Sequence, residues 1–201
     1  MTHARALPQQ ILAHALKLGE GAPLTAKGLL HLGNRAAIDQ ALKRLAERGA
    51  LMKVSRGIYV LPVQGRFGQR PPSVEKIVQR LASTFGETVV AHGAAAANRL
   101  GLTTQVPVRP VYLTSGRPRR LEVGRQKIEL RSAPPHLLAC PNRPAGEALR
   151  ALAWLGRNQA HEASRKISKI LESSEREAFE ALRSTMPGWM AASVSEAMVN
   201  G

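Results

Sequence analysis

The sequence predicts an α+β protein, with a helical N-terminal region closed by a β-hairpin and a mixed α/β region that ends in a helical bundle. Three features predict this class. They are apolar residues at helical spacing before residue 50, two short apolar runs flanking Ser55–Gly57, and strands alternating with helices after residue 73. The chain has 201 residues, of which 44% are hydrophobic and 3% aromatic, so it can bury a core built mainly from Leu, Ala, Val and Ile.

The first two helices are predicted from spacing and breakers. A helix of about eleven residues is expected around an apolar group at helical spacing, Ile11, Leu12, Ala15 and Leu16. The glycines and proline of residues 19–23 end it. Thr25 is a suitable N-cap for a short helix that carries Leu29 and Leu30.

The third helix has the most regular pattern. Asn34 is its expected N-cap and Gly49 its expected C-terminal glycine. Between them, one apolar stripe is formed by Ile38, Ala41, Leu42 and Leu45. The apolar runs 51–54 and 58–61 then predict a hairpin, in which Gly57 supplies a positive φ. Three helices, a Gly33-containing turn and a hairpin are the outline of a winged helix-turn-helix.

The chain is expected to divide into two domains. Residues 65–72 are rich in Gly and Pro and predict a linker between a winged helix-turn-helix at 1–64 and a C-terminal domain at 73–201. Residues 1–72 hold 11 basic and 3 acidic side chains, and residues 73–201 hold 18 and 11. The net charge of +15 favours DNA, RNA or an acidic membrane surface as partner, although a basic surface without such a partner has the same composition.

The third helix is the predicted reader of DNA. If its apolar stripe faces inward, its polar face carries Arg35, Ala36, Asp39, Gln40, Lys43 and Arg44. Arg35 suits guanine and Gln40 suits adenine, while the amides after Asn34 can hold a phosphate. Asp39 is repelled by phosphates, so it either accepts from cytosine or orients Arg35 or Lys43. The alternative is an ordinary solvated helix face.

The hairpin is the predicted wing. Arg56 lies at its tip beside Ser55, where it can reach the DNA backbone or the minor groove, and Lys53 can add a phosphate contact. Lys43 and Arg44 are expected to contact phosphates as well. A turn that merely improves solubility is the alternative.

The C-terminal region alternates strands and helices. Ser73 is expected to cap a helix, residues 89–91 to form a strand, and residues 93–97 to form a closely packed helix. Further strands are expected at 111–113 and 127–130, around a loop that holds a second basic cluster, Arg117, Arg119, Arg120 and Arg125. That loop could contact DNA, RNA or a protein partner, or be solvated. The last sixty residues read as helices, with a capping box at Ser174 and Glu177 and with Pro187 opening the final helix.

No catalytic, metal or cofactor site is predicted. The six histidines, His3, His14, His31, His92, His136 and His161, lack metal-ligand spacing. Helix capping explains the Ser73…Lys76 spacing, and His92 is best explained as a cap too. Cys140 has no evident histidine partner. A nucleic-acid-processing enzyme is therefore the least favoured alternative.

A cytoplasmic location is expected. The single cysteine excludes a disulfide within the chain, which fits a reducing compartment. Residues 1–8 lack the apolar core of a signal peptide, and no run of about 18 apolar residues occurs.

Two blocks of sequence resemble one family. Residues 24–27, 32–45 (LGNRAAIDQALKRL) and 56–62 (RGIYVLP) resemble the N-terminal domain of AbiEi-type antitoxins. Residues 91–102 (AHGAAAANRLGL), 104–107 (TQVP) and 111–116 (VYLTSG) are similar to the signature early in that family's C-terminal domain. The resemblance covers residues 7–135.

The resemblance implies a bipartite protein of an abortive-infection (type IV toxin–antitoxin) system. Its winged helix would bind double-stranded DNA at its own promoter and repress transcription, and its C-terminal domain would counteract a nucleotidyltransferase-like toxin. A DNA-binding regulator without a toxin is the main alternative, and general RNA binding is another. Both a monomer and a homodimer on DNA are compatible with the sequence.

Overall fold

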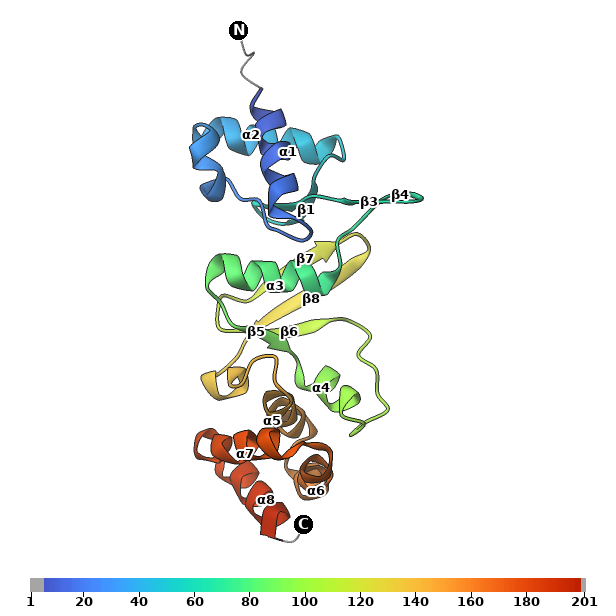
Figure 1. The fold of residues 1–201 in the computed structure, drawn as a ribbon, viewed down its shortest axis with the longest axis vertical. Helices are drawn as coiled ribbons and strands as arrows, with labels where there is room; N and C mark the ends of the chain where they lie inside the picture. The colour runs from blue at the N-terminus through green and yellow to red at the C-terminus, as the bar shows by residue number, and fades with distance from the viewer. Residues whose placement is uncertain (1–5, 200–201) are drawn as a thin grey trace. The chain divides into compact units, whose positions relative to one another are not determined.

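The computed structural model describes residues 6–199, with side chains through residue 197. His3 and most of the segment considered for a signal peptide lie outside the described residues. The fold is mixed α+β, as predicted, with helices at the start and a group of helices at the end (Figure 1). The chain divides into two compact units. The first comprises Met1–Glu87 and Arg120–Ile128, and the second comprises Thr88–Arg119 and Glu129–Gly201.

The first unit begins with helices and continues with two hairpins. Its elements are α1 (Leu7–Leu18), the 3₁₀ helix η1 (Lys27–Leu32), α2 (Arg35–Glu47), β1 (Met52–Ser55), β2 (Ile58–Val60), β3 (Val63–Gly65), β4 (Gly68–Arg70) and α3 (Val74–Phe85). β1 pairs with β2 and β3 with β4, both antiparallel. Leu24 also bridges to Tyr59, which joins the segment before η1 to the hairpin β1–β2.

The core of this unit matches the helical pattern of the sequence, with two exceptions. All four stripe residues of α2 are buried, together with Ile11 and Leu29. Leu16 and Leu30, which belong to the apolar residues of the expected helices, are 69% and 50% exposed and lie outside this core. Leu16 lies beside buried Ala15 on α1, at the edge of a stripe that Ile11 and Ala15 already fill.

The segment expected to be an irregular linker, residues 65–72, contributes to a regular hairpin. The pairing runs from Val63 opposite Arg70 to Gly65 opposite Gly68. It lies within the first unit, which also takes in α3, so the compact units differ from the expected domains 1–64 and 73–201. Helix α3 buries Val74, Ile77, Val78 and Leu81. Figure 1 shows α3 lying across the hairpin of β7 (Arg119–Val123) and β8 (Gln126–Ser132).

A four-stranded sheet has the order β5-β6-β8-β7, and the division into units passes through β7 and β8. β5 (Val89–Ala91) is antiparallel to β6 (Val111–Thr114), and β6 is parallel to β8. The remaining elements of the second unit are α4 (Gly93–Arg99), η2 (Pro135–Leu138), α5 (Pro144–Leu155), η3 (Arg157–Gln159), α6 (Ala160–Ile170), α7 (Ser173–Ala181), η4 (Leu182–Thr185) and α8 (Gly188–Val199).

The expected capping box at Ser174 is wrong. Helix α7 begins at Ser173, and its N-cap Glu172 makes no side-chain capping bond. A carboxylate in its first turn serves another helix instead, because Glu175 accepts the N–H of Ala145 at 2.9 Å and pairs with Arg143 at 2.8 Å. Glu175 therefore satisfies the start of α5 and fastens α7 to it. Both interactions hold the pKa of the Glu175 carboxyl below its usual value.

Within residues 6–199, no helix has both the length and the apolar character that crossing a bilayer requires.

Candidate nucleic-acid interface

Helix α2 turns a mostly polar face to solvent. Because Ile38, Ala41, Leu42 and Leu45 are buried, the opposite face is left exposed, with Arg35, Ala36, Asp39, Gln40, Lys43 and Arg44. The side-chain oxygen of Asn34 accepts the N–H of Ala37 at 2.9 Å, so Asn34 caps the helix as predicted. The capping fixes where the helix starts and thereby the phase of the exposed face.

The charges on this face are partly paired along the helix. Arg35 Nε lies 3.7 Å from Asp39 Oδ2, so Asp39 lies next to Arg35, one of the two partners considered from the sequence. Lys43 Nζ lies 3.9 Å from Glu47 Oε1. Exposed pairs at this spacing contribute only about 0.3–0.5 kcal/mol. Arg35 can therefore exchange Asp39 for a stronger acceptor at little energetic cost.

The hairpin β1–β2 presents two cations. Lys53 and Arg56 are exposed, and Gly57 has the predicted positive φ, +69°. Ser55 has a partner that the sequence did not predict, since its Oγ donates to the carbonyl oxygen of Arg120 at 3.1 Å. The end of β1 is thereby joined to β7 within the first unit.

The sequence predicted that the second basic cluster lies in one loop, but the structure divides it between a strand and two connecting segments. Arg119 and Arg120 open the strand β7, Arg125 lies in the turn before β8, and Arg117 precedes β7. Arg120 and Arg125 belong to the first unit, whereas Arg117 and Arg119 belong to the second. Polar and apolar residues alternate from 120 to 123, and this alternation is a sequence signal for a strand.

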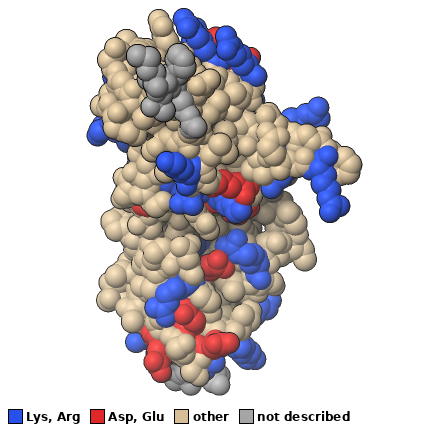
Figure 2. Space-filling view, turned by 45° about the horizontal axis from the view of Figure 1, so that its top comes forward, with Lys and Arg blue, Asp and Glu red and all other residues tan. Residues whose placement is uncertain are grey.

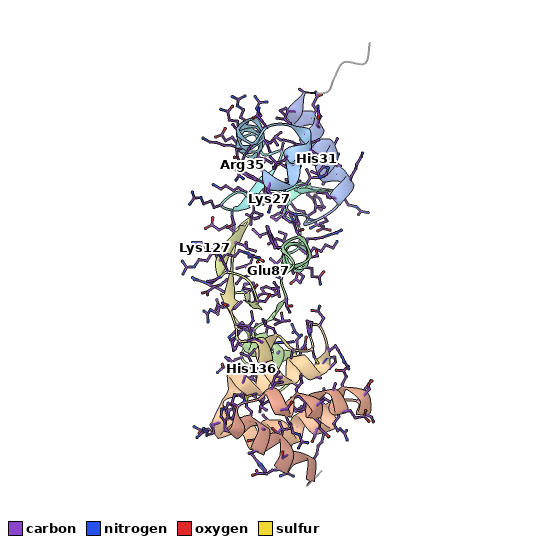
Figure 3. All side chains as sticks on the ribbon, turned by 90° about the vertical axis from the view of Figure 1, so that its left-hand side faces the viewer. Lys27, His31, Arg35, Glu87, Lys127 and His136 are labelled. Carbon is purple, nitrogen blue, oxygen red and sulfur yellow. The ribbon has the colours of Figure 1, made fainter. Side chains whose placement is uncertain are left out.

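Lys127 is a further exposed cation, one that was not among the residues predicted to bind DNA. Buried Leu121, Val123 and Ile128 define the inner face of the β7–β8 hairpin, so Arg120 and Lys127 lie on its outer face. In Figure 3, Arg35 and Lys127 both lie on the left-hand side of the view. Five cations of the first unit together form what we term the basic strip: Lys53, Arg56, Arg120, Arg125 and Lys127.

The basic strip lacks acidic partners. Within the described part of the chain, none of its five side chains has a carboxylate within ion-pair distance, although Glu122 is exposed on β7. The first unit holds 16 Lys and Arg against 6 Asp and Glu, and the second holds 13 against 8, which gives net charges of +10 and +5. On the face shown in Figure 2, basic side chains form separate groups, and acidic ones lie beside several of them.

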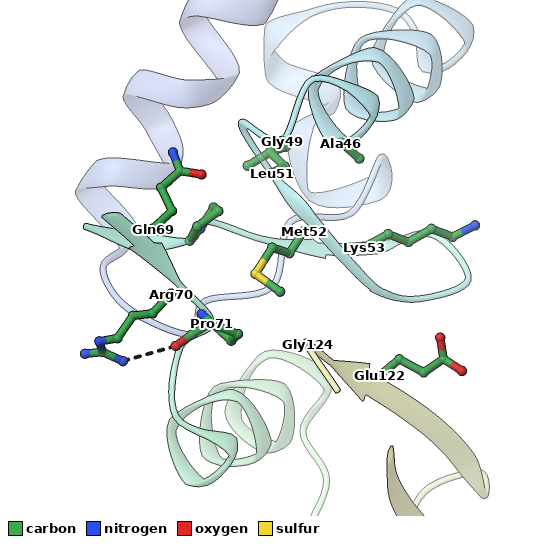
Figure 4. A pocket seen from close by; sticks show the side chains of 11 residues that line it. Ala46, Gly49, Leu51, Met52, Lys53, Gln69, Arg70, Pro71, Glu122 and Gly124 are labelled. Carbon is green, nitrogen blue, oxygen red and sulfur yellow. Dashed lines mark hydrogen bonds between the residues drawn. The ribbon is translucent and has the colours of Figure 1, made fainter. Parts of the chain in front are cut away.

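A groove of about 480 Å³ lies beside the basic strip in the first unit (Figure 4). Its walls include Met52 and Lys53 of β1, Pro71, and Glu122 and Gly124 of the β7–β8 hairpin. Pro71 lies close to Gly124, where a Cβ would come within 2.9 Å of Pro71 Cγ. Glu122 is the one carboxylate in the lining, so the groove offers no pair of acidic groups for acid–base chemistry.

His92 is an N-cap, as the sequence suggested. Its Nδ1 accepts the N–H of Ala94 at 3.2 Å, at the start of α4. Only the neutral imidazole can accept this bond. Burial lowers the pKa of His92, Arg131 lowers it further, and Glu129 opposes the shift. Within the described residues, no three His, Cys, Asp or Glu side chains are grouped as metal ligands would be.

This arrangement makes stability depend on pH. We expect the free energy of unfolding to fall as the pH drops below 6.5, the ordinary histidine value, because the unfolded chain then binds a proton that folded His92 resists. His92→Asn keeps an acceptor at the N-cap and should show a shallower decline. Urea titrations at several pH values between about 7.5 and 5 measure both slopes. The pKa of His14 is also lowered by burial, but His14 is present in both proteins, so its contribution to the two slopes is the same. Equal slopes would contradict the assignment.

One comparison with known proteins places the chain in a family. A family of unknown function (DUF6088) matches residues 10–179. The chain belongs to this family. A search of the curated proteins and a search of the solved structures found no match to the chain. The family match runs from α1 into α7 and so includes parts of both compact units.

Proposed function

We propose that this DUF6088 member is a sequence-specific DNA-binding repressor of its own promoter, acting in the cytoplasm through a winged helix-turn-helix in its first unit. The observation that carries the proposal is the association of two features in that unit. One is the exposed polar face of α2, and the other is a set of cations without carboxylate partners on the neighbouring hairpins.

Each part has a role that follows from its chemistry. Helix α2 would lie in the major groove, with Arg35 directed to guanine and Gln40 to adenine. Ala36 is small enough to allow close approach or contact with a thymine methyl. Lys43, Arg44 and the basic strip would contact phosphates, with Arg56 as the tip of the wing. The bond from Ser55 to Arg120 supports this assignment, because it fastens the wing to a second basic hairpin.

The test is a titration with DNA from upstream of the gene, against a scrambled duplex of the same composition, at physiological salt. A preference of about a thousandfold or more would support sequence-specific regulation. Equal and steeply salt-dependent affinity for the two duplexes would overturn it, because charge alone would then account for binding. RNA bound as tightly as the upstream DNA would also count against it.

An antitoxin role for the second unit is the remaining part of the proposal. It is supported by the similarity of residues 91–102 and 111–116 to AbiEi-type antitoxins. Co-expression with a nucleotidyltransferase-like toxin encoded beside the gene tests it. Restored growth of the toxin-producing cells would support an antitoxin role. Operator binding without such protection would support a DNA-binding regulator that has no antitoxin role.

Arg35 should read one base. We expect Arg35→Ala to relax base preference at a single position of the operator, at a cost of about 1–3 kcal/mol for the preferred base. Binding to a panel of single-base operator variants measures this. Arg80→Ala, which removes an exposed arginine of α3, is the control and should leave the base preferences unchanged. A uniform loss across the panel would make Arg35 a phosphate contact instead.

A further inference from the structure

A second hairpin of the first unit has an unusual tip. The arm, which we define as residues 63–70, consists of β3 and β4 joined through Arg66 and Phe67. Phe67 is fully exposed, whereas Phe179 is buried and Phe85 is 42% exposed. In Figure 1 the arm projects to the side of the elements around it. Single exposed hydrophobic residues are common, so it is the position of Phe67 that calls for an explanation.

The local sequence places Phe67 at the tip. Gly65 and Gly68 face each other as the last pair of the ladder, and Gly68 adopts a φ of +108° that lets the chain return. Every residue from 64 to 70 is exposed, so the tip packs against no core. A buried phenylalanine would contribute about 1.5–3 kcal/mol to folding, and Phe67 contributes nothing of this kind.

Polar contacts connect the base of the arm to neighbouring residues, while its tip is exposed. Arg70 Nη1 lies 3.6 Å from Glu20 Oε1 and donates to the carbonyl of Pro71 at 3.1 Å, the dashed line in Figure 4. Glu20 also pairs with Lys76 and accepts the N–H of Ser73 at 3.2 Å. The hydrogen bonds from Lys76 and from the N–H of Ser73 lower the pKa of the Glu20 carboxyl. The base of the arm is therefore connected through Glu20 to the start of α3.

Charge indicates which partner fits the arm. Residues 61–71 contain Arg66 and Arg70 and no acidic residue, and Arg66 has no ion pair in the described part of the chain. The arm belongs to the unit with a net charge of +10. An apolar wedge between cations, carried on a narrow β-ribbon, matches the minor groove, where such side chains separate base pairs and Arg binds the walls. An apolar protein groove would leave Arg66 unpaired.

We propose that the arm lies in the minor groove of duplex DNA beside the segment contacted by α2, and that Phe67 inserts between two base pairs there. The proposal rests on the proposed DNA binding by α2, and it adds a second contact that changes the shape of the DNA. Insertion unstacks one step and kinks the duplex, so the repressor would bend its operator. Insertion would occur most readily at a flexible base-pair step such as TA, and this preference would add specificity outside the segment contacted by α2.

The experiment compares two duplexes bound by the full chain. One holds only the segment protected by α2, and the other adds about ten base pairs on each side, with 2-aminopurine at successive flanking positions. We expect the fluorescence of one flanking probe to rise severalfold on binding, because unstacking relieves its quenching. Phe67→Ala should abolish the rise and weaken binding to the flanked duplex roughly tenfold, while the affinity for the short duplex is unchanged. Phe67→Trp should restore both.

Leu16→Ala is the matched control, since it removes another exposed hydrophobic side chain of the same unit and should have no effect. Specific binding of the short duplex with no probe response and no loss in Phe67→Ala would overturn the arm proposal and leave the proposed function intact. Failure of the wild type to prefer upstream DNA would overturn both. A change of oligomeric state in Phe67→Ala without DNA, seen by sedimentation, would make the arm a protein contact and overturn insertion.

Discussion

Replacing three cations of the basic strip together, as Lys53→Gln/Arg56→Gln/Arg120→Gln, is expected to weaken operator binding roughly a hundredfold at about 0.1 M salt. Each side chain is exposed and has no carboxylate partner in the described part of the chain, so each can replace a counterion at a phosphate. The slope of log affinity against log salt should fall by about 0.9 per contact. Titrations at four salt concentrations measure the affinity and the slope together.

The control removes the same charge elsewhere. Arg157→Gln/Arg165→Gln/Lys169→Gln changes three exposed cations of η3 and α6 in the second unit. Net charge falls equally in the two triple variants, so a long-range effect of charge would weaken binding equally. We expect the control to lose roughly threefold or less, because it removes no phosphate contact. Equal losses would show that the basic strip has no special place in the interface.

The part of the site predicted best from sequence is the part governed by local rules. The phase of α2 follows from the i, i+3, i+4, i+7 spacing of its apolar residues, and its start follows from Asn34. Gly57 was predictable in the same way, because a tight turn needs a residue that tolerates positive φ. Each of these features depends on residues within two turns of chain, so one sequence is sufficient to predict them.

The parts that were missed depend on distant contacts. Ser55 and Arg120 are 65 residues apart, and no spacing rule pairs a hydroxyl with a backbone carbonyl at that separation. The expected Arg117–Arg125 cluster is also divided, because Arg120 and Arg125 belong to the first unit and Arg117 belongs to the second. The exposure of Leu16 has a related cause: spacing gives the width of an apolar stripe, but only packing decides which edge of the stripe is covered. The proposed interface therefore includes residues beyond α2 and the β1–β2 hairpin.

Gly93→Ala should be the most destabilising single substitution proposed for this chain, costing about 3 kcal/mol or more. A Cβ at this position would lie 2.2 Å from the backbone oxygen of Arg150 and 2.5 Å from Trp154 Cβ. Helix α4 packs directly on α5 there, with Ala96 and Ala97 fully buried at the same contact. The obstacle is backbone, so no side-chain rotation can remove it. Urea unfolding of the full chain measures the loss.

Helix α5 is poorly able to move away from the added methyl group. The buried Arg150 donates from Nη1 to the carbonyls of Leu137 and Ala139, both at 3.3 Å, so a shift of α5 would strain these bonds. Burial lowers the pKa of Arg150 to about 10, which leaves it charged at neutral pH and dependent on those carbonyls. Gly188→Ala is the control, because a Cβ there meets nothing within 4 Å, and it should be nearly neutral. If Gly93→Ala unfolded at the same urea concentration as Gly188→Ala, α4 and α5 would have to be farther apart in solution than in this structure.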